Sequence, residues 1–425
     1  MTTRSADTLN ALPGSTLRTT TGNWVDGDQF FGRDSELHQL RERLDAGDHI
    51  LLSAMRRIGK TSLMRETIRR MKGEYRTVFV DLESCGDFTE AVAHLAAGMS
   101  KHVSVLSKIK SWFKDGVDNL DEVQIADLTV RLRDRIGAGW RDRGDEVLAT
   151  MAAGSPRVVV FIDELPILLG KCLRTETGDV SADGRREVEQ FMLWLRWNAQ
   201  QHQGRLSFVF AGSIGIEPLL RSVGLSASLN NVVSVNLEPW DTETALSCWG
   251  ALGRNYDLEI DYAAGERMAE RLGVCIPYHV QLFFDRVRDD ARRRKARTVT
   301  LTDVDRVYAE RMLRAQGGQD LHHMEERLRL AIRKPLQALA FDLLTQAAVT
   351  PALTASAALE LAGRRVPPDT TDAALREVFE TLEHDGYLDL GPHGHVFLSH
   401  LLRDFWERRF RRGFRPAGVD GGGHS

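Results

Sequence analysis

The chain has 425 residues, of which 42% are hydrophobic and 27% are charged. This balance is typical of a globular protein that is long enough for two or three domains. The formal net charge is −4, so no global positive field attracts the whole chain to nucleic acid or to an anionic membrane. No apolar run approaches the roughly 18 residues that a membrane span needs, and the first residues lack the apolar core of a signal peptide. We therefore expect a cytoplasmic protein without a membrane segment.

The cysteines are not spaced for a metal site. The four of them lie far apart and form no C-x-x-C pair, and no histidine flanks them at metal-ligand spacing. We expect buried free thiols at Cys85, Cys172, Cys248 and Cys275.

The first strongly patterned stretch follows a polar N-terminus. Residues 1–24 are rich in threonine, serine, glycine and aspartate, which predicts a flexible leader. Leucines then recur at helical spacing in residues 35–44, where we expect a helix. In residues 49–64 the sequence predicts a buried strand, a tight loop and a helix in succession.

This loop matches the phosphate-binding pattern G-x-x-x-x-G-K-[ST], with Ala54 in place of the first glycine. Gly59 lets the backbone turn so that its N–H groups face phosphates, and Lys60 has the reach to contact the β and γ oxygens. The Thr61 hydroxyl is a predicted ligand of Mg²⁺. An ordinary strand-to-helix turn is the alternative, and the strand–loop–helix context argues against it. The other loop residues that we expect at the nucleotide are Arg56, Arg57, Ile58 and Ser62.

A second signal is a pair of acids at the end of an apolar run. Five consecutive apolar residues lead directly into Asp163 and Glu164. A buried parallel strand that ends there places both acids at the carboxyl edge of the sheet, where ligands bind in open α/β folds. Asp163 is a predicted Mg²⁺ ligand, and Glu164 is the predicted base that polarises the attacking water. The alternative is a strand that simply ends in polar residues.

A third apolar run, residues 206–211, ends shortly before Ser213. That hydroxyl is a candidate to sense the γ-phosphate or to orient the water, and a turn residue that caps the next helix is an equal alternative. Runs at residues 77–82 and 232–237 read as further strands, and helical patterns alternate with them. This alternation predicts an α/β fold with a parallel sheet.

The C-terminal part has a different pattern. From residue 261 it is predicted to be helical throughout, and from residue 336 three helices precede a short hairpin and a last helix. Three helices followed by a two-stranded wing are typical of a winged helix-turn-helix domain. The predicted divisions are a leader (1–24), a phosphate-loop core (25–240), a helical lid (241–330), a winged-helix domain (331–412) and a disordered tail (413–425).

The winged-helix pattern leaves DNA binding open. The third helix of a DNA reader carries basic or amide side chains toward the bases, whereas this one carries a single arginine and several acids, which repel phosphate unless they face away. We therefore favour contact with a protein or an autoregulatory role. DNA contact through two basic clusters is the alternative. One cluster begins at Arg292 and ends at Arg297, and the other begins at Arg403 and ends at Arg415.

Five stretches together resemble the archaeal-type ATPases of the STAND and AAA+ superfamily, and the resemblance covers about residues 26–410. The loop Arg-Arg-x-Gly-Lys-Thr-Ser-Leu is fairly specific to that group. The stretches are Phe31-Gly32-Arg33-Asp34, Arg56-Arg57-Ile58-Gly59-Lys60-Thr61-Ser62-Leu63, Phe161-Ile162-Asp163-Glu164, Ala211-Gly212-Ser213-Ile214-Gly215, and Pro277-Tyr278 with the winged helix.

The resemblance implies a role for several of these residues. It places Gly32 and Arg33 beside the adenine and ribose, Ser213 at the sensor-1 position, and Pro277 in the lid against the base. It also implies a nucleotide-driven switch in which the lid and the winged helix move relative to the ATPase core. Arg221 is only a candidate for an arginine finger or for the sensor-2 position, so completion of the site by a second copy in a homo-oligomer stays open.

The leading hypothesis is a P-loop ATPase that binds and slowly hydrolyses Mg-ATP and changes its contacts with a partner protein. Its fold class is α/β, with a P-loop NTPase parallel sheet core, a helical lid and a C-terminal winged helix-turn-helix domain. The alternative is a DNA-associated AAA+ ATPase of the origin-binding or transposition-regulator type. A nucleotide-gated scaffold without hydrolysis is a third reading, and the intact acidic pair argues against it.

Overall fold

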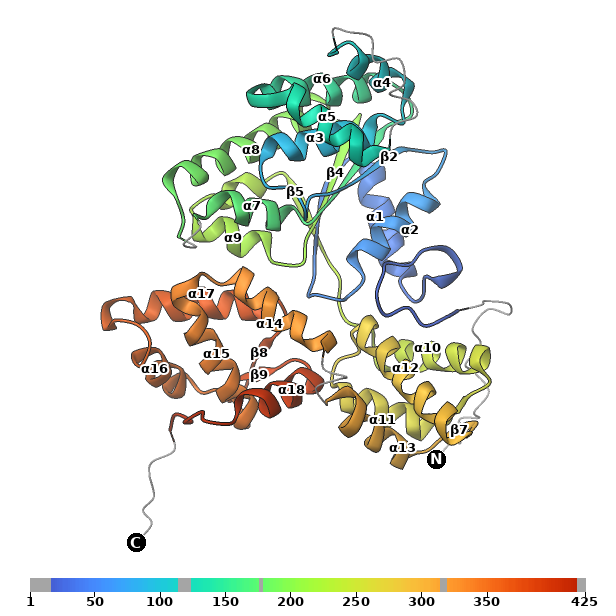
Figure 1. Cartoon of the computed structure of the whole chain (residues 1–425), viewed down its shortest axis with the longest axis vertical. Coiled ribbons are helices and arrows are strands. Elements are labelled where there is room, and N and C mark those ends of the chain that lie inside the picture. The colour runs from blue at the N-terminus through green and yellow to red at the C-terminus, as the bar shows by residue number, and fades with distance from the viewer. Residues whose placement is uncertain (1–16, 114–123, 176–178, 314–318, 419–425) are drawn as a thin grey trace. The chain divides into compact units, whose positions relative to one another are not determined.

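The computed structural model describes residues 17–113, 124–175, 179–313 and 319–418, and these fall into two compact units (Figure 1). We call the unit of residues 34–53 and 63–237 the sheet unit. The other, the helical unit, holds the residues before 34, residues 54–62 and the residues from 238 on. The phosphate-loop core expected over residues 25–240 is therefore not one packing unit.

The sheet unit is built on five parallel strands in the order β2-β3-β4-β1-β5 (Figure 1). The two strands β3 and β4 are buried along their whole length, which is why both read as continuous apolar runs. The predicted α/β fold with a parallel sheet is confirmed. The strands are β1 (His49–Ser53), β2 (Arg76–Asp81), β3 (Val158–Asp163), β4 (Leu206–Ala211) and β5 (Val232–Asn236).

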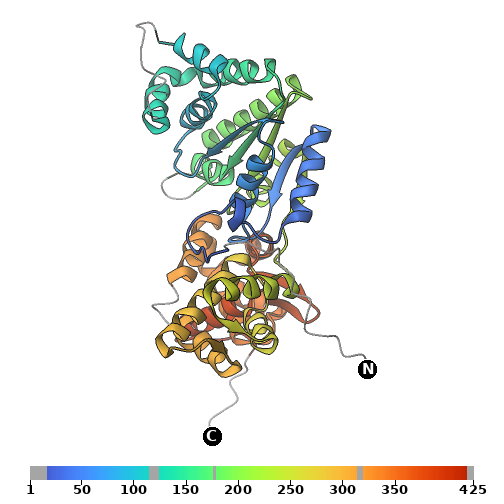
Figure 2. The same cartoon turned by 90° about the vertical axis from the view of Figure 1, so that its right-hand side faces the viewer.

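Helices cover both faces of this sheet (Figure 2). The crossover from β1 to β2 and the crossover from β3 to β4 run in opposite directions along the sheet. Because crossovers are right-handed, α2 lies on one face and α7 and α8 lie on the other. The helices are α1 (Asp34–Ala46), α2 (Lys60–Arg70), α3 (Phe88–Met99), α4 (Val103–Lys110), α5 (Ile125–Ile136), α6 (Trp140–Ala153), α7 (Leu165–Leu173), α8 (Ala182–Gln201) and α9 (Ile216–Ser222).

Two segments of the sheet unit show how local residues set the ends of helices. The chain after β2 forms two helices, α3 and α4, because α3 is capped at Ser100, whose hydroxyl donates to Ala97 O. The apolar residues after Glu164 form α7, with Pro166 in its first turn, a position that suits the fixed φ of proline.

The helical unit begins with four helices around one core, residues 241–313, which we call the helical domain. Asp290 of α12 accepts hydrogen bonds from Arg306 at 2.7 and 2.9 Å and from Arg294 at 2.8 Å. These guanidinium groups lower the pKa of Asp290 to about 2 and so tie α12 to α13. The sequence analysis expected only helices in this domain from residue 261 on and did not predict the short parallel strand pair of β6 and β7. The elements are α10 (Thr242–Tyr256), α11 (Tyr262–Leu272), α12 (Pro277–Arg294), α13 (Leu301–Val307), a π-helical turn (Tyr308–Met312), β6 (Glu259–Ile260) and β7 (Thr298–Val299).

The remaining residues, 319–418, form the C-terminal segment. Its first helix, α14, precedes three further helices, an antiparallel hairpin and a last helix, which follow one another in the order that the sequence predicted from residue 336 on. The last helix joins this segment to the helical domain, because Ser399 Oγ donates to Leu272 O at 3.3 Å and Tyr308 OH donates to Asp404 at 2.9 Å. The elements are α14 (Gln319–Ala331), α15 (Lys334–Val349), α16 (Ala355–Gly363), α17 (Thr371–His384), β8 (Leu388–Gly391), β9 (Gly394–Phe397) and α18 (His400–Phe410).

Both ends of the described chain are more tightly packed than the sequence predicts. Leu17, inside the expected leader, is buried, and Thr20 N donates to Gln281 of α12 at 2.7 Å. At the other end Ala417 is buried in what we expected to be a disordered tail, and its N–H donates to Gln346 at 2.9 Å. Short polar stretches that pair through their backbone leave no periodic signal in the sequence.

Two further expectations concern the cysteines and the membrane. All four cysteines are free, and three are buried as expected, whereas Cys172 is partly exposed. Burial raises the pKa of the Cys85, Cys172 and Cys248 thiols to about 12. Within the described part of the chain, no helix has the length and the apolar character needed to cross a membrane.

Candidate functional site

The phosphate loop, residues 54–59, continues the chain directly after β1 and leads into α2 at Lys60. Gly59 has φ +101°, a conformation that only glycine adopts without cost, and Ala54 does not have a positive φ. The Lys60 side chain is buried, and its Nζ donates to Ala54 O at 2.7 Å and to Met55 O at 3.0 Å. The amine therefore lies inside the curve of the loop, where an anion would meet it.

Two side chains hold the ends of this loop. Arg33 is buried, and its Nη2 donates to Ile58 O at 3.3 Å. Ser62 Oγ, in the first turn of α2, accepts the Val25 N–H at 3.0 Å. The residues before α1 thus support the loop. For Arg33 the structure gives a contact with the loop, in addition to the role beside the ribose that the resemblance implies.

Among the described residues, four residues other than glycine have a positive φ. Asp257 and Lys295 are the C-caps of α10 and α12, where a left-handed residue is common. The other two are Arg57 in the phosphate loop, with φ 65°, and Glu164, with φ 56°. Such a conformation costs about 1–3 kcal/mol and persists where the surroundings impose it, often at functional sites.

The acidic pair lies at the carboxyl end of β3. Asp163 is buried, and its Oδ1 accepts the Glu164 N–H at 3.0 Å. The Glu164 carboxylate in turn accepts two hydrogen bonds, both at 2.9 Å, from the N–H and the hydroxyl of Ser213. Because β3 and β4 are neighbours, the residues that follow them meet at this edge. The structure thus brings two of the predicted catalytic residues together.

Asp163 and Thr61 each carry an oxygen of the kind that binds Mg²⁺. The ion takes oxygen ligands, mostly one or two carboxylates beside water and phosphate oxygens. Asp163 offers a buried carboxylate at the sheet edge, and Thr61 offers a hydroxyl in the first turn of α2. No cluster of three or more histidine, cysteine or acidic side chains suited to a metal occurs in the described residues.

The sequence analysis missed Trp240, which connects two segments of the candidate site. Gly32 has φ +63°, and a Cβ on it would lie 2.8 Å from Thr244 Cγ2 and 3.5 Å from Trp240 Nε1. The backbone N–H of Trp240 also donates to Cys275 O at 3.1 Å, two residues before Pro277. Trp240 therefore brings Gly32 and the start of α12 together. Its only sequence signal is its place after Pro239, next to the cap of α10.

The C-terminal segment contacts the phosphate loop, which the sequence did not predict either. A Cβ on Gly386 would lie 2.7 Å from Met55 Cβ and 2.9 Å from Met55 Cε. Gly386 has φ +76° and follows the end of α17. The next residue, Tyr387, is buried and donates its hydroxyl to Met324 O at 2.6 Å. The backbone beside Met55 is therefore firmly anchored.

Three further residues that the sequence predicted for the site, Pro277, Arg56 and Arg221, lie in separate segments of the chain. Pro277 is buried and starts α12. The charge of Arg56 is near enough to Tyr387 to oppose the rise that burial causes in the pKa of that phenol. Arg221 is in the last turn of α9, in the sheet unit.

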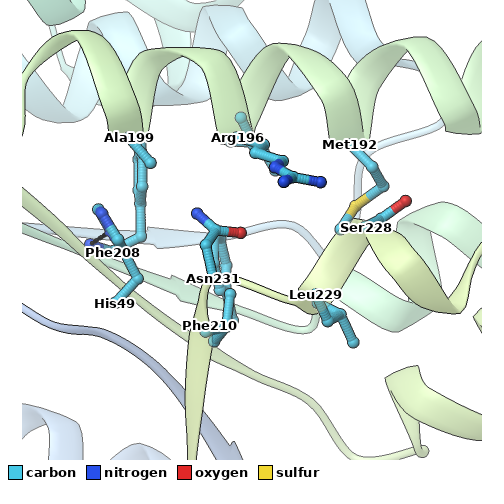
Figure 3. A pocket seen from close by; sticks show the side chains of 11 residues that line it. His49, Met192, Arg196, Ala199, Phe208, Phe210, Ser228, Leu229 and Asn231 are labelled. Carbon is cyan, nitrogen blue, oxygen red and sulfur yellow. Dashed lines mark hydrogen bonds between the residues drawn. The ribbon is translucent and has the colours of Figure 1, made fainter.

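A small pocket lies elsewhere in the sheet unit, between α8 and the sheet (Figure 3). Its lining includes His49 and Val232, the first residues of β1 and β5, whereas the candidate site follows the last residues of the strands. The lining is largely apolar. We therefore do not assign this pocket to the nucleotide. It is lined by His49, Met192, Leu195, Arg196, Ala199, Phe208, Phe210, Ser228, Leu229, Asn231 and Val232.

His49 makes stability depend on pH. It is buried, its Nδ1 accepts the Phe208 N–H at 3.1 Å, and burial lowers its pKa below the usual value of 6.5. The folded chain thus favours the neutral ring, so this contribution to stability is present above the unfolded pKa and is lost as pH falls from there toward the folded pKa. We expect a loss of at most about 1.4 kcal/mol per pH unit for this group. Thermal unfolding of wild type and His49→Gln from pH 7.5 to 5 tests this, and parallel curves would contradict it.

Comparison with known proteins gives a likeness in structure alone. No family model matches the chain, and no curated protein matches it in sequence. A Walker-type ATPase of Pyrococcus abyssi superposes with a TM-score of 0.56 at 18% identity, over 92% of this chain and 98% of that one. The Aeropyrum pernix ORC2 protein, solved with ADPNP and ADP, has a TM-score of 0.52 at 11% identity, over 92% and 97% of the two chains. The chain therefore has a P-loop NTPase fold.

Proposed function

We propose that this protein binds and hydrolyses Mg-ATP and works as a nucleotide-driven switch that changes its contact with a partner protein. The observation that carries the ATPase proposal is the pair of functional segments at the ends of parallel strands. The phosphate loop with its buried Lys60 follows β1, and the acidic pair ends β3. Similar folds include a Walker-type ATPase and a protein solved with ADPNP and ADP.

Each residue has a role in this proposal. Lys60 binds the β- and γ-phosphates, and bound Mg²⁺, held by Thr61 and Asp163, would neutralise phosphate charge. Glu164 orients and polarises the attacking water. Ser213 fixes the direction of the Glu164 carboxylate through its two hydrogen bonds. Positioning and charge stabilisation then supply the catalysis.

The contact of Met55 with Gly386 supports the switch. A loop that changes shape when phosphate binds is in van der Waals contact with the C-terminal segment. A change in the nucleotide can therefore be transmitted to that segment without an intermediary. The output that we propose is a changed contact between the C-terminal segment and another protein.

Truncation of Met55 is expected to weaken this coupling. Met55→Ala removes the side chain that meets Gly386, so we expect ATP turnover and ADP release to rise about fivefold, at the lower end of typical coupling free energies. The control is Leu390→Ala, because Leu390 is 67% exposed on the hairpin of the same segment. Steady-state turnover and release of a fluorescent ADP measure the effect. Rates equal to those of wild type would show that the contact plays no part.

The DNA-associated ATPase is the second candidate, because the C-terminal segment has the helix order of a winged helix. Against it, many arginines of the two basic clusters are paired within the chain, and the acids of α17 include the exposed Asp372. Ion pairs join Arg294 to Asp290 and Asp303, Arg297 to Asp257, Arg403 to Asp404, Arg409 to Glu325, and Arg411 to Glu407.

ATP turnover across protein concentration, with and without duplex DNA, separates these proposals. A low rate that DNA does not change supports the protein-partner switch. A rate that DNA raises, with binding that weakens steeply as salt increases, supports the DNA-associated ATPase, since phosphate contacts release counterions. A specific rate that rises with protein concentration supports sites completed between copies of the chain. No turnover in Mg-ATP under any of these conditions would overturn the ATPase proposal.

A further inference from the structure

The phosphate loop contains a residue whose backbone does not suit its side chain. Arg57 has φ 65°, in the left-handed region where glycine is at ease and a residue with a Cβ is strained. Its guanidinium carbon lies 4.3 Å from the centroid of the Tyr278 ring, within the range of a cation–π interaction. Tyr278 is 8% exposed, so this contact is largely shielded from water. A side-chain contact thus accompanies the strained backbone.

We propose that Tyr278 is a positioning residue of the phosphate loop, which holds Arg57 and thereby keeps the loop curled around Lys60. The proposal rests on the proposed nucleotide site and adds a regulatory path to it. Tyr278 is the second residue of α12. The shape of the loop then depends on where the start of α12 lies.

The start of α12 is anchored in the helical domain. The carbonyl of Val280 accepts the indole N–H of Trp249, which is 1% exposed, at 2.9 Å. Tyr278 packs edge to face on His279 with ring centroids 5.7 Å apart. The ring that supports Arg57 therefore moves only with α12. A rearrangement of the helical domain removes the support, and the strained residue then relaxes to negative φ.

An alternative is that Arg57 acts on phosphate through its charge and that Tyr278 only fills space. The pair of variants Arg57→Ala and Arg57→Gly separates these roles. Both remove the guanidinium group, but only alanine keeps the Cβ that strains the left-handed backbone. Positioning predicts that Arg57→Gly binds ATP at least about fivefold more tightly than Arg57→Ala. Equal loss in both variants would overturn the proposal.

Tyr278 is tested in both backgrounds. In the wild-type chain, Tyr278→Leu is expected to weaken ATP binding about fivefold, and Tyr278→Phe, which keeps an aromatic face, less than about twofold. In the Arg57→Gly chain, Tyr278→Leu is expected to have no further effect on ATP binding. Glycine adopts the left-handed backbone without strain, so the loop no longer needs Tyr278 to hold it. Equal loss in the two backgrounds would assign Tyr278 to direct contact with the nucleotide and overturn the positioning role.

Amide hydrogen exchange without nucleotide gives a second readout. The amides of residues 55–59 should exchange faster in Tyr278→Leu and Arg57→Ala than in wild type, and this difference should be absent between Arg57→Gly and its Tyr278→Leu double variant. If the wild-type chain binds no ATP, the proposed function fails while exchange still decides the positioning role. Exchange rates of residues 55–59 that stay at the wild-type level in Tyr278→Leu and Arg57→Ala would overturn the positioning role. Because Arg57 is only half-buried, its variants report on the loop even if Tyr278→Leu does not fold.

Discussion

Glu164→Gln is expected to bind ATP as wild type does and to lose turnover by about 10²–10⁴-fold, the usual contribution of a general base. The change keeps the size of the side chain, and its carbonyl oxygen still accepts a hydrogen bond from Ser213, but the amide cannot polarise water as a carboxylate does. Affinity for a fluorescent ATP analogue and phosphate release over time are the two measurements.

The matched control for Glu164 is Glu187→Gln. Glu187 is exposed on α8, so its replacement removes the same charge from the sheet unit without changing the candidate site. Turnover in this control should stay within about twofold of wild type, as surface substitutions change little. Equal turnover in wild type and Glu164→Gln would remove Glu164 from the mechanism.

Lys60→Ala is expected to abolish nucleotide binding at ordinary concentrations, with an affinity lower by about 100-fold or more. The loss follows from two charged hydrogen bonds to phosphate, each of about 1.5–3 kcal/mol. Since Lys60 Nζ also donates to Ala54 O and Met55 O, the free energy of unfolding should fall too. Calorimetric titration with Mg-ATP and thermal unfolding separate the two effects.

The chain offers a second lysine with the same kind of contacts. Lys171 Nζ donates to Glu83 O at 2.6 Å and to Cys85 O at 3.1 Å, and all three residues belong to the sheet unit. Lys171→Ala should lower thermal stability by a similar amount and leave ATP affinity unchanged. If Lys60→Ala binds ATP as tightly as Lys171→Ala does, the phosphate-binding role of the loop is wrong.

The sheet could be predicted from sequence because two of its strands, β3 and β4, are fully buried. Both β3 and β4 read as apolar runs with polar residues directly after them, and parallel strands bring such ends to one edge. This reasoning placed Asp163 and Glu164 at that edge, and the structure adds the hydrogen bonds that join Glu164 to Ser213 there. The first part of α7 was not recognised as helix, because the apolar residues after Glu164 continue the apolar pattern of β3 and a short run fits either period.

Contacts between distant parts of the chain could not be predicted in the same way. Met55 occupies a variable position of the loop pattern, and Gly386 reads as the glycine that ends a helix. Nothing in the spacing of either residue points to the other. The positions of Trp240, Gly32 and Cys275 in the sequence likewise gave no reason to expect contacts between them. Such pairs depend on how separate elements pack, which local patterns do not encode.

The division of the chain into units has a consequence for biosynthesis. All residues of the sheet unit precede residue 238, whereas the phosphate loop packs with residues that follow it. Because chains are made from the N-terminus and domains fold as units during synthesis, the sheet can form while the ribosome still holds the rest. The loop acquires its contacts with Tyr278 and Gly386 only later. The proposed nucleotide site is therefore completed only after the whole sheet unit has been made.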